Sequence, residues 1–129
     1  MSQLNLLGSS IPGDMNLQNS TGADIAARLC VALDTSTEGL ITLTSADTDF
    51  FGVLMEAAYD TKFARVRNTP GARVVGVASD TIAIGDELMS DSAGKVLKAT
   101  TGKRICGRAL TAASSADAVA FTILSGYAP

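Results

Sequence analysis

Short apolar runs separated by turn residues are the feature that most constrains the fold of this chain. Over residues 82–124 such runs alternate with turn signals, among them Gly85–Asp86 and Gly102–Lys103. Runs of this length and spacing are typical of antiparallel strands in a sandwich or barrel. No run has the length and the 3.6-residue periodicity of a long helix, so the pattern predicts an all-β protein.

The same pattern extends upstream and predicts a small antiparallel β-barrel or sandwich. Residues 40–43 are strongly β-prone, and a turn around Pro70 separates two further apolar runs. The expected strands cover residues 28–33, 40–43, 51–57, 63–67, 73–78, 82–84, 87–89, 96–99, 105–109 and 119–124.

The sequence also contains an internal repeat. A displacement of 55 residues carries Gly39 onto Gly94 and Gly52 onto Gly107, so that residues 50–58 repeat the pattern of residues 105–113. A duplicated β unit is the simplest account of this match. The alternative is that a small barrel rich in Ala, Gly and Thr reuses similar strand sequences.

Residues 1–27 differ from the rest and predict an extended N-terminal arm, followed by a β-barrel domain at residues 28–129. The segment holds Pro12, many Ser and Asn residues and scattered apolar side chains, but no basic residue. We expect it to pack on its own barrel or on a neighbouring subunit; the alternative is a loose terminus. The expected partner-binding anchors of the arm are Leu4, Leu6, Leu7 and Ile11.

Composition narrows the classes of function. The 129 residues are enough for one domain with its own core, and the net charge of −3 gives no electrostatic footprint for nucleic acid or an anionic membrane. Aromatic residues make up only 5%, which argues against a deep aromatic ligand pocket. The N-terminus lacks the pattern of a signal peptide, and no run is as long as a membrane span.

Charge is distributed unevenly along the chain. The first 60 residues hold eight acidic residues and one basic residue, Arg28, whereas the remainder holds nine basic and five acidic residues. Such asymmetry would suit association of unlike faces. The simpler alternative is that the fold interleaves both parts, so that the charges mix on the surface.

The residue types needed for most catalysis are missing, and we expect no enzyme, no cofactor and no metal site. The chain has no His, which excludes Ser–His–Asp and Cys–His mechanisms. Asp47 and Asp49 lie in a Ser/Thr-rich loop, where they are expected to stabilise turns. Cys30 and Cys106 have apolar neighbours and are expected to be buried free thiols.

The C-terminal half resembles small phage capsid decoration, or cement, proteins. That family combines a Gly-Asp-x-apolar motif, a short Gly turn, an apolar-Gly-x-Ala-Leu-x-Ala-Ala motif and a final apolar strand. This chain matches them at residues 85–88, 93–96, 106–113 and 118–124. The likeness covers roughly the last 50 residues, and its motifs are structural rather than catalytic.

The resemblance implies a structural virion protein with a compact, β-tulip-like domain. Such a protein is made in the host cytoplasm and binds the outer surface of an icosahedral head as a homotrimer. There it stabilises contacts between subunits of the major capsid protein, its expected partner, through several weak contacts at once.

Two alternatives remain open. A tail-tube or head–tail connector protein is also a small β-barrel with arms, but it would polymerise into rings or filaments rather than form a small closed oligomer. A β module that binds small molecules or glycans, or an unusual enzyme, is the third reading. The scarcity of aromatic residues and the absence of His argue against it.

Overall fold

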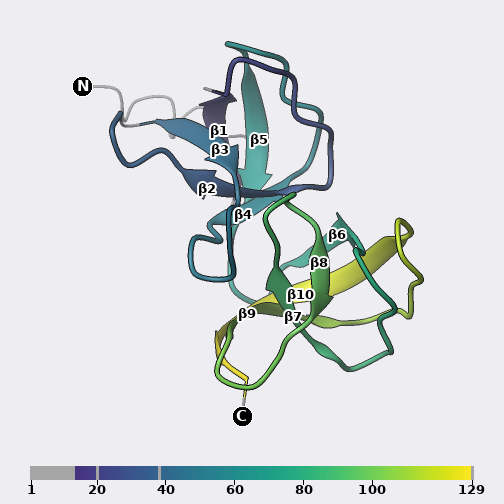
Figure 1. Ribbon diagram of the computed structural model, residues 1–129. Coiled ribbons are helices and arrows are strands. Elements are labelled where there is room, and N and C mark those ends of the chain that lie inside the picture. The colour runs from purple at the N-terminus through teal and green to yellow at the C-terminus, as the bar shows by residue number, and fades with distance from the viewer. Residues whose placement is uncertain (1–13, 20, 38, 129) are drawn as a thin grey trace.

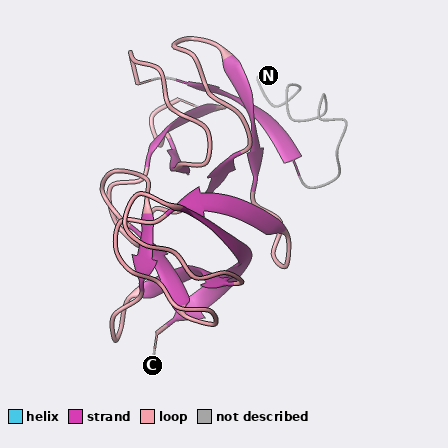
Figure 2. Cartoon of the chain, turned by 90° about the vertical axis from the view of Figure 1, so that its right-hand side faces the viewer, coloured by secondary structure: helices cyan, strands magenta, loops and turns pink. Residues whose placement is uncertain are grey.

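The computed structural model describes residues 14–19, 21–37 and 39–128, and the regular structure in these ranges is entirely β (Figures 1 and 2). This confirms the all-β expectation. The strands are β1 (Asp14–Asn19), β2 (Cys30–Leu33), β3 (Leu40–Leu43), β4 (Gly52–Leu54), β5 (Phe63–Arg67), β6 (Arg73–Val77), β7 (Glu87–Ser90), β8 (Val96–Lys98), β9 (Arg104–Ala109) and β10 (Ala118–Tyr127).

The strands form two five-stranded units, one above the other in Figure 1. The first is a closed barrel in the order β1-β3-β2-β4-β5, and the second is a sheet in the order β6-β10-β9-β7-β8. The parallel pair β1–β3 closes the barrel. In the second unit a single parallel bridge between Ala78 and Val96 occupies the equivalent place.

The two units are structural repeats of each other, which confirms the expected duplication. Successive strands of the barrel correspond to successive strands of the second unit, and each corresponding pair of neighbours is hydrogen-bonded in the same orientation. The isolated bridge between Ile25 and Ala58 recurs as the bridge between Ile82 and Ala113. Both bridges are made by two backbone hydrogen bonds of 2.8–3.0 Å.

Strand β1 lies within the range that the sequence assigned to an irregular arm. It pairs with β5 from Asp14–Arg67 to Gln18–Phe63 and buries Leu17 in the barrel. Residues 14–19 are therefore part of the barrel, because cross-strand partners compensate for a sequence with weak strand propensity. The expected arm anchors Leu4, Leu6, Leu7 and Ile11 lie outside the described residues.

Several expected strands are shorter in the structure, and two differ most. Residues 82–84 contribute only the bridge at Ile82, and Ile84 is 72% exposed. Strand β4 covers Gly52–Leu54 rather than residues 51–57, because the chain turns away after Leu54.

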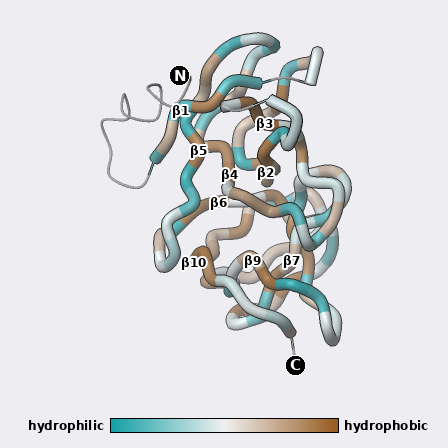
Figure 3. Tube along the Cα trace, turned by 90° about the vertical axis from the view of Figure 1, so that its left-hand side faces the viewer, coloured by the Kyte–Doolittle hydropathy of each residue, from teal (hydrophilic) through white to brown (hydrophobic). Residues whose placement is uncertain are grey.

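Buried apolar side chains form two clusters, and hydrophobic segments run through the strands of both units in Figure 3. One cluster fills the barrel and contains Leu17, Ile25, Val31, Ile41, Leu54, Ala58, Ala64 and Val66. The other fills the second unit and also takes in Cys30 and Val53 from the barrel. The second core therefore extends across the junction between the units.

Gly52 and Gly107 occupy equivalent positions in the two units, and close packing at both positions requires glycine. A Cβ atom on Gly52 would lie 2.7 Å from the Val66 side chain and 2.8 Å from the Arg67 carbonyl oxygen. A Cβ atom on Gly107 would collide with the Phe121 ring and with the carbonyl oxygen of β10 behind it. In both units the absence of a side chain on the glycine lets a large core residue of the neighbouring strand pack directly against it.

We expect Gly107→Ala to destabilise the protein by about 3 kcal/mol, because the collision involves backbone as well as a ring that is completely buried. Urea unfolding measures the loss. Gly102→Ala is the control: Gly102 has a left-handed φ of 81° but open space around it, so its cost should be only about 1 kcal/mol. Equal losses in the two variants would contradict the packing argument.

Candidate functional site

The site lies where the barrel meets the second unit. Polar contacts tie the two together: the Cys30 amide donates to the Gly94 carbonyl (2.7 Å) and the Ser90 hydroxyl to the Ala46 carbonyl (2.7 Å). The Arg104 amide donates to the Asp47 carboxylate (2.8 Å). These bonds and the shared core fix the relative position of the two units, so a surface formed by both is preorganised.

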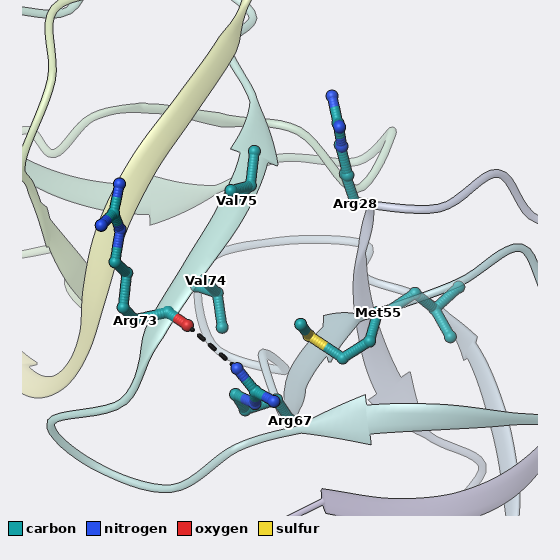
Figure 4. Close-up of a pocket in the computed structure, with 7 residues that line it drawn as sticks. Arg28, Met55, Arg67, Arg73, Val74 and Val75 are labelled. Carbon is teal, nitrogen blue, oxygen red and sulfur yellow. Dashed lines mark hydrogen bonds between the residues drawn. The ribbon is translucent and has the colours of Figure 1, made fainter.

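A groove of about 470 Å³ opens at the edge of this junction (Figure 4). Aliphatic side chains of β4 and β6 and the side chain of Met55 form its apolar part, and three arginines surround it. The lining residues are Arg28, Leu54, Met55, Arg67, Arg73, Val74 and Val75.

Arg67 is held rigidly by a buried carboxylate. Its Nε atom lies 2.7 Å from Asp14 Oδ1 and its Nη2 atom 3.2 Å from Asp14 Oδ2, and the Asp14 side chain is completely buried. Arg67 Nη1 also donates to the Arg73 carbonyl at 3.3 Å, which links the barrel to β6. The hydrogen bond that Arg67 donates to Asp14 raises the pKa of Arg67 despite partial burial.

Arg28 and Arg73 are different, because both are exposed and their guanidinium groups make no hydrogen bond or ion pair within the part of the chain that the structure describes. In Figure 4 they lie on either side of Val75. Of the three arginines that line the groove, only Arg67 pairs with Asp14, whose Oδ2 also lies 4.0 Å from Arg65 Nη1 outside the groove. The groove therefore carries a local positive charge on a protein whose net charge is −3.

The backbone at Arg28 is strained. Its φ is 73°, in the left-handed region that residues other than Gly rarely adopt. The Arg28 amide donates to the Leu54 carbonyl, just as the Gly85 amide donates to the Ala109 carbonyl at the equivalent place in the second unit. Gly85 has a φ of 88°, so both units adopt the left-handed conformation at this position. Only the first unit has a charged residue, Arg28, in this conformation.

Groups that could perform metal chemistry are not assembled: no cluster of three or more His, Cys, Asp or Glu residues occurs in the described ranges. No helix in those ranges is long and apolar enough to cross a membrane. The groove instead combines an apolar surface with cationic forks, which is suited to binding a carboxylate or another anion attached to an aliphatic group.

The acidic loop singled out in the sequence stabilises local structure and the junction. Asp49 accepts hydrogen bonds from the Ser45 amide and hydroxyl, both at 2.8 Å, and from the Ala46 amide. Burial alone would raise the pKa of Asp49, but these hydrogen bonds outweigh it and lower the pKa. Asp49 therefore has the expected role in turn structure, whereas Asp47 accepts a hydrogen bond from the Arg104 amide across the junction.

The two cysteines are free thiols and both are buried, as expected. They come from different units and interact directly: the hydrogen bond with Cys106, together with burial, raises the pKa of Cys30 well above its usual value. A protonated, buried thiol is a poor nucleophile, so this pair contributes to the shared core.

One face of β5 carries two arginines. Phe63, Arg65 and Arg67 share one face, opposite the buried Ala64 and Val66. Arg65 pairs with the exposed Glu56, whereas Arg67 enters the groove. Sequence reasoning did not single out Arg28 or Arg73 as site residues. Arg28 could not be found from the repeat, because the displacement of 55 residues carries it onto Ala83, whereas the structure makes it equivalent to Gly85.

We expect Asp14→Ala to destabilise the protein by about 2–4 kcal/mol, because it removes the buried partner of Arg67. Urea unfolding of the full chain measures this loss. Glu56→Ala is the matched control, since it removes an exposed ion pair with Arg65 and should cost less than about 1 kcal/mol. A loss for Asp14→Ala no larger than that of the control would refute a structural role of the buried pair.

No protein-family model and no curated protein matches the sequence. Among solved structures, the fold is similar to the head fiber gp8.5 N base of bacteriophage phi29. The TM-score is 0.70, the match covers 90% of this chain and 97% of that chain, and 17% of the aligned residues are identical. The ten-stranded, two-unit arrangement of the described residues is therefore shared with a domain of a phage head protein over nearly its full length.

Proposed function

We propose that this chain is a structural virion protein, a decoration protein that binds the outer surface of an icosahedral phage head. In this role it stabilises contacts between subunits of the major capsid protein and has no catalytic activity. The observation that carries the proposal is the similarity to the phi29 head fiber base, because that similarity spans both units rather than one common barrel.

The residues support this proposal in a second, independent way. The motifs that resemble capsid decoration proteins lie in the second unit, where residues 85–88 and 106–113 form β7, β9 and the turns beside them. A small, rigid protein with a preorganised groove is suited to contacting several subunits at once. Several weak contacts then add up to stable attachment and favour the lattice to which the protein binds.

The partner and the oligomeric state follow from the same proposal. A homotrimer placed between capsid subunits would present three copies of each contact surface. The apolar residues Leu4, Leu6, Leu7 and Ile11 would then bind a neighbouring subunit and add to the affinity.

A second candidate function is favoured by the structure to which this fold is similar. That structure is the N base of a head fiber, so the two-unit fold of this chain could serve as the part of an appendage that attaches to the head. The mass of the particle-bound polypeptide that contains this chain separates the two: a fiber base belongs to a longer polypeptide, whereas a decoration protein is small.

We expect this chain to sediment with phage particles in a density gradient, at a ratio near one copy per major capsid protein if it covers the lattice. An antibody against the chain, applied to gradient fractions and to a denaturing gel, measures both the ratio and the polypeptide mass. A ratio of a few per cent would favour a fiber, connector or tail component. Absence from particles would refute the proposed function.

We expect removal of residues 1–12 to leave a folded protein that binds heads at least about tenfold more weakly, as loss of one contact of a multivalent set predicts. The truncation must stop before Asp14, because β1 begins there and closes the barrel. Replacement of Leu4, Leu6, Leu7 and Ile11 by Ser in the full chain is the companion variant. Full occupancy of particles by both variants would show that the arm is not a binding element.

A further inference from the structure

We infer that the groove lined by Arg28, Arg67 and Arg73 is a docking site for a partner-protein segment that carries a carboxylate beside an aliphatic side chain. Under the proposed function, on which this inference rests for the identity of the partner, that segment belongs to the capsid surface.

Charge complementarity favours an acidic occupant. Asp14 satisfies Arg67, but Arg28 and Arg73 have no acidic partner in the described ranges. A guanidinium group offers a planar fork of donors that matches a carboxylate, and such charge-assisted bonds are among the strongest in proteins. A carboxylate bound at either arginine would supply an acidic partner that the described ranges do not provide.

The apolar lining distinguishes a peptide from a free ion. Leu54, Met55, Val74 and Val75 line the same groove as the arginines. Contact with their apolar surface would not stabilise a bound inorganic anion. An aliphatic side chain next to the carboxylate would lose water on packing against them, which favours binding. The volume of about 470 Å³ accommodates a few side chains and excludes a folded domain.

Nucleic acid is a poorer occupant for the same groove. Phosphate would also satisfy the arginines, but single-stranded nucleic acid binds through bases stacked on aromatic side chains. None of the residues that line the groove is aromatic. The groove therefore favours an acidic peptide over nucleic acid, and an oligonucleotide serves as the competing ligand in the binding experiment.

The strain at Arg28 is the second observation that points to a ligand. The equivalent residue of the second unit is Gly85, which adopts the same left-handed backbone without penalty. An arginine at such a position costs stability, and the guanidinium group of Arg28 makes no hydrogen bond or ion pair with the described residues that would offset the cost. Strained residues of this kind concentrate at binding sites, where the side chain is needed for an external partner.

The proposal predicts opposite effects of one substitution on stability and on binding. Arg28→Gly should leave the melting temperature unchanged or higher, because it restores the residue found in the second unit. The same substitution should weaken binding of an acidic segment by at least about tenfold, as loss of a hydrogen bond between charged groups does. Arg73→Gln should weaken binding similarly.

The binding measurement uses the full chain labelled with ¹⁵N and a capped hexapeptide of sequence Gly-Leu-Glu-Leu-Asp-Gly as the probe. We expect its chemical-shift changes to concentrate at the amides of Leu54, Met55, Val74 and Val75. The matched peptide Gly-Leu-Gln-Leu-Asn-Gly has the same shape without charge and should bind at least about tenfold more weakly.

Two control variants separate the groove from general effects. Thr61→Gly relieves the same kind of strain, since Thr61 has a φ of 63°, but it does not line the groove. Lys103→Gln removes an exposed positive charge elsewhere on the second unit. Both should bind the acidic peptide as the unmodified chain does.

Several results would overturn the inference: shift changes away from the groove, equal binding of the neutral peptide, or undiminished binding by Arg28→Gly and Arg73→Gln. Equal or tighter binding of a thymidine oligonucleotide at the same amides would assign the groove to nucleic acid instead. Full occupancy of particles by both arginine variants would refute the groove as the capsid contact while leaving the proposed function intact. If the chain binds the peptide at the groove but is absent from particles, the groove remains a docking site and the proposed function is refuted.

Discussion

The structure depends on the burial of one face of the barrel against the second unit. Cys30 and Val53 lie side by side on β2 and β4, and both are completely buried in the core cluster of the second unit. Burying a side chain of this size contributes roughly 1.5–3 kcal/mol. Because this contact and the hydrogen bonds around it fix the two units relative to each other, the groove at the edge of the junction has a defined shape before any ligand binds.

The outer face of the second unit differs in chemistry from the face of the barrel that is buried at the junction. The pair in the second unit that corresponds to Cys30 and Val53 is Glu87 and Arg108, in the same register between β7 and β9. These two form an ion pair at 3.7 Å, with the Arg108 side chain 54% exposed. A third unit stacked in the same way would have to bury this charged pair, which costs more than the attraction returns. The outer face of the second unit is therefore polar, as the outer face of a capping repeat is in longer solenoids.

Local patterns in the sequence predicted most of the strands, because apolar runs bounded by Gly and Pro encode strands and turns without reference to the rest of the chain. The repeat was visible for the same reason: Gly52 and Gly107 face equivalent packing constraints. Strand β1 was not predicted, since Asp14 gains its place in a strand only from Arg67, far away in sequence. The groove was missed as well, because its arginines come from three segments that only the tertiary fold brings together.

The two units also act as an internal comparison that separates the requirements of the fold from additions made to it. Positions that keep the same residue type or the same backbone conformation, such as the left-handed turns at Thr61 and Ala116, belong to the common architecture. Positions that differ in chemistry at an identical backbone geometry are not dictated by the fold. Arg28 and Gly85 differ in this way, as do Cys30 and Glu87. The first difference adds charge to a groove, and the second decides which face is buried. Arg28 and Cys30, the members of these pairs in the first unit, both lie at the junction between the units.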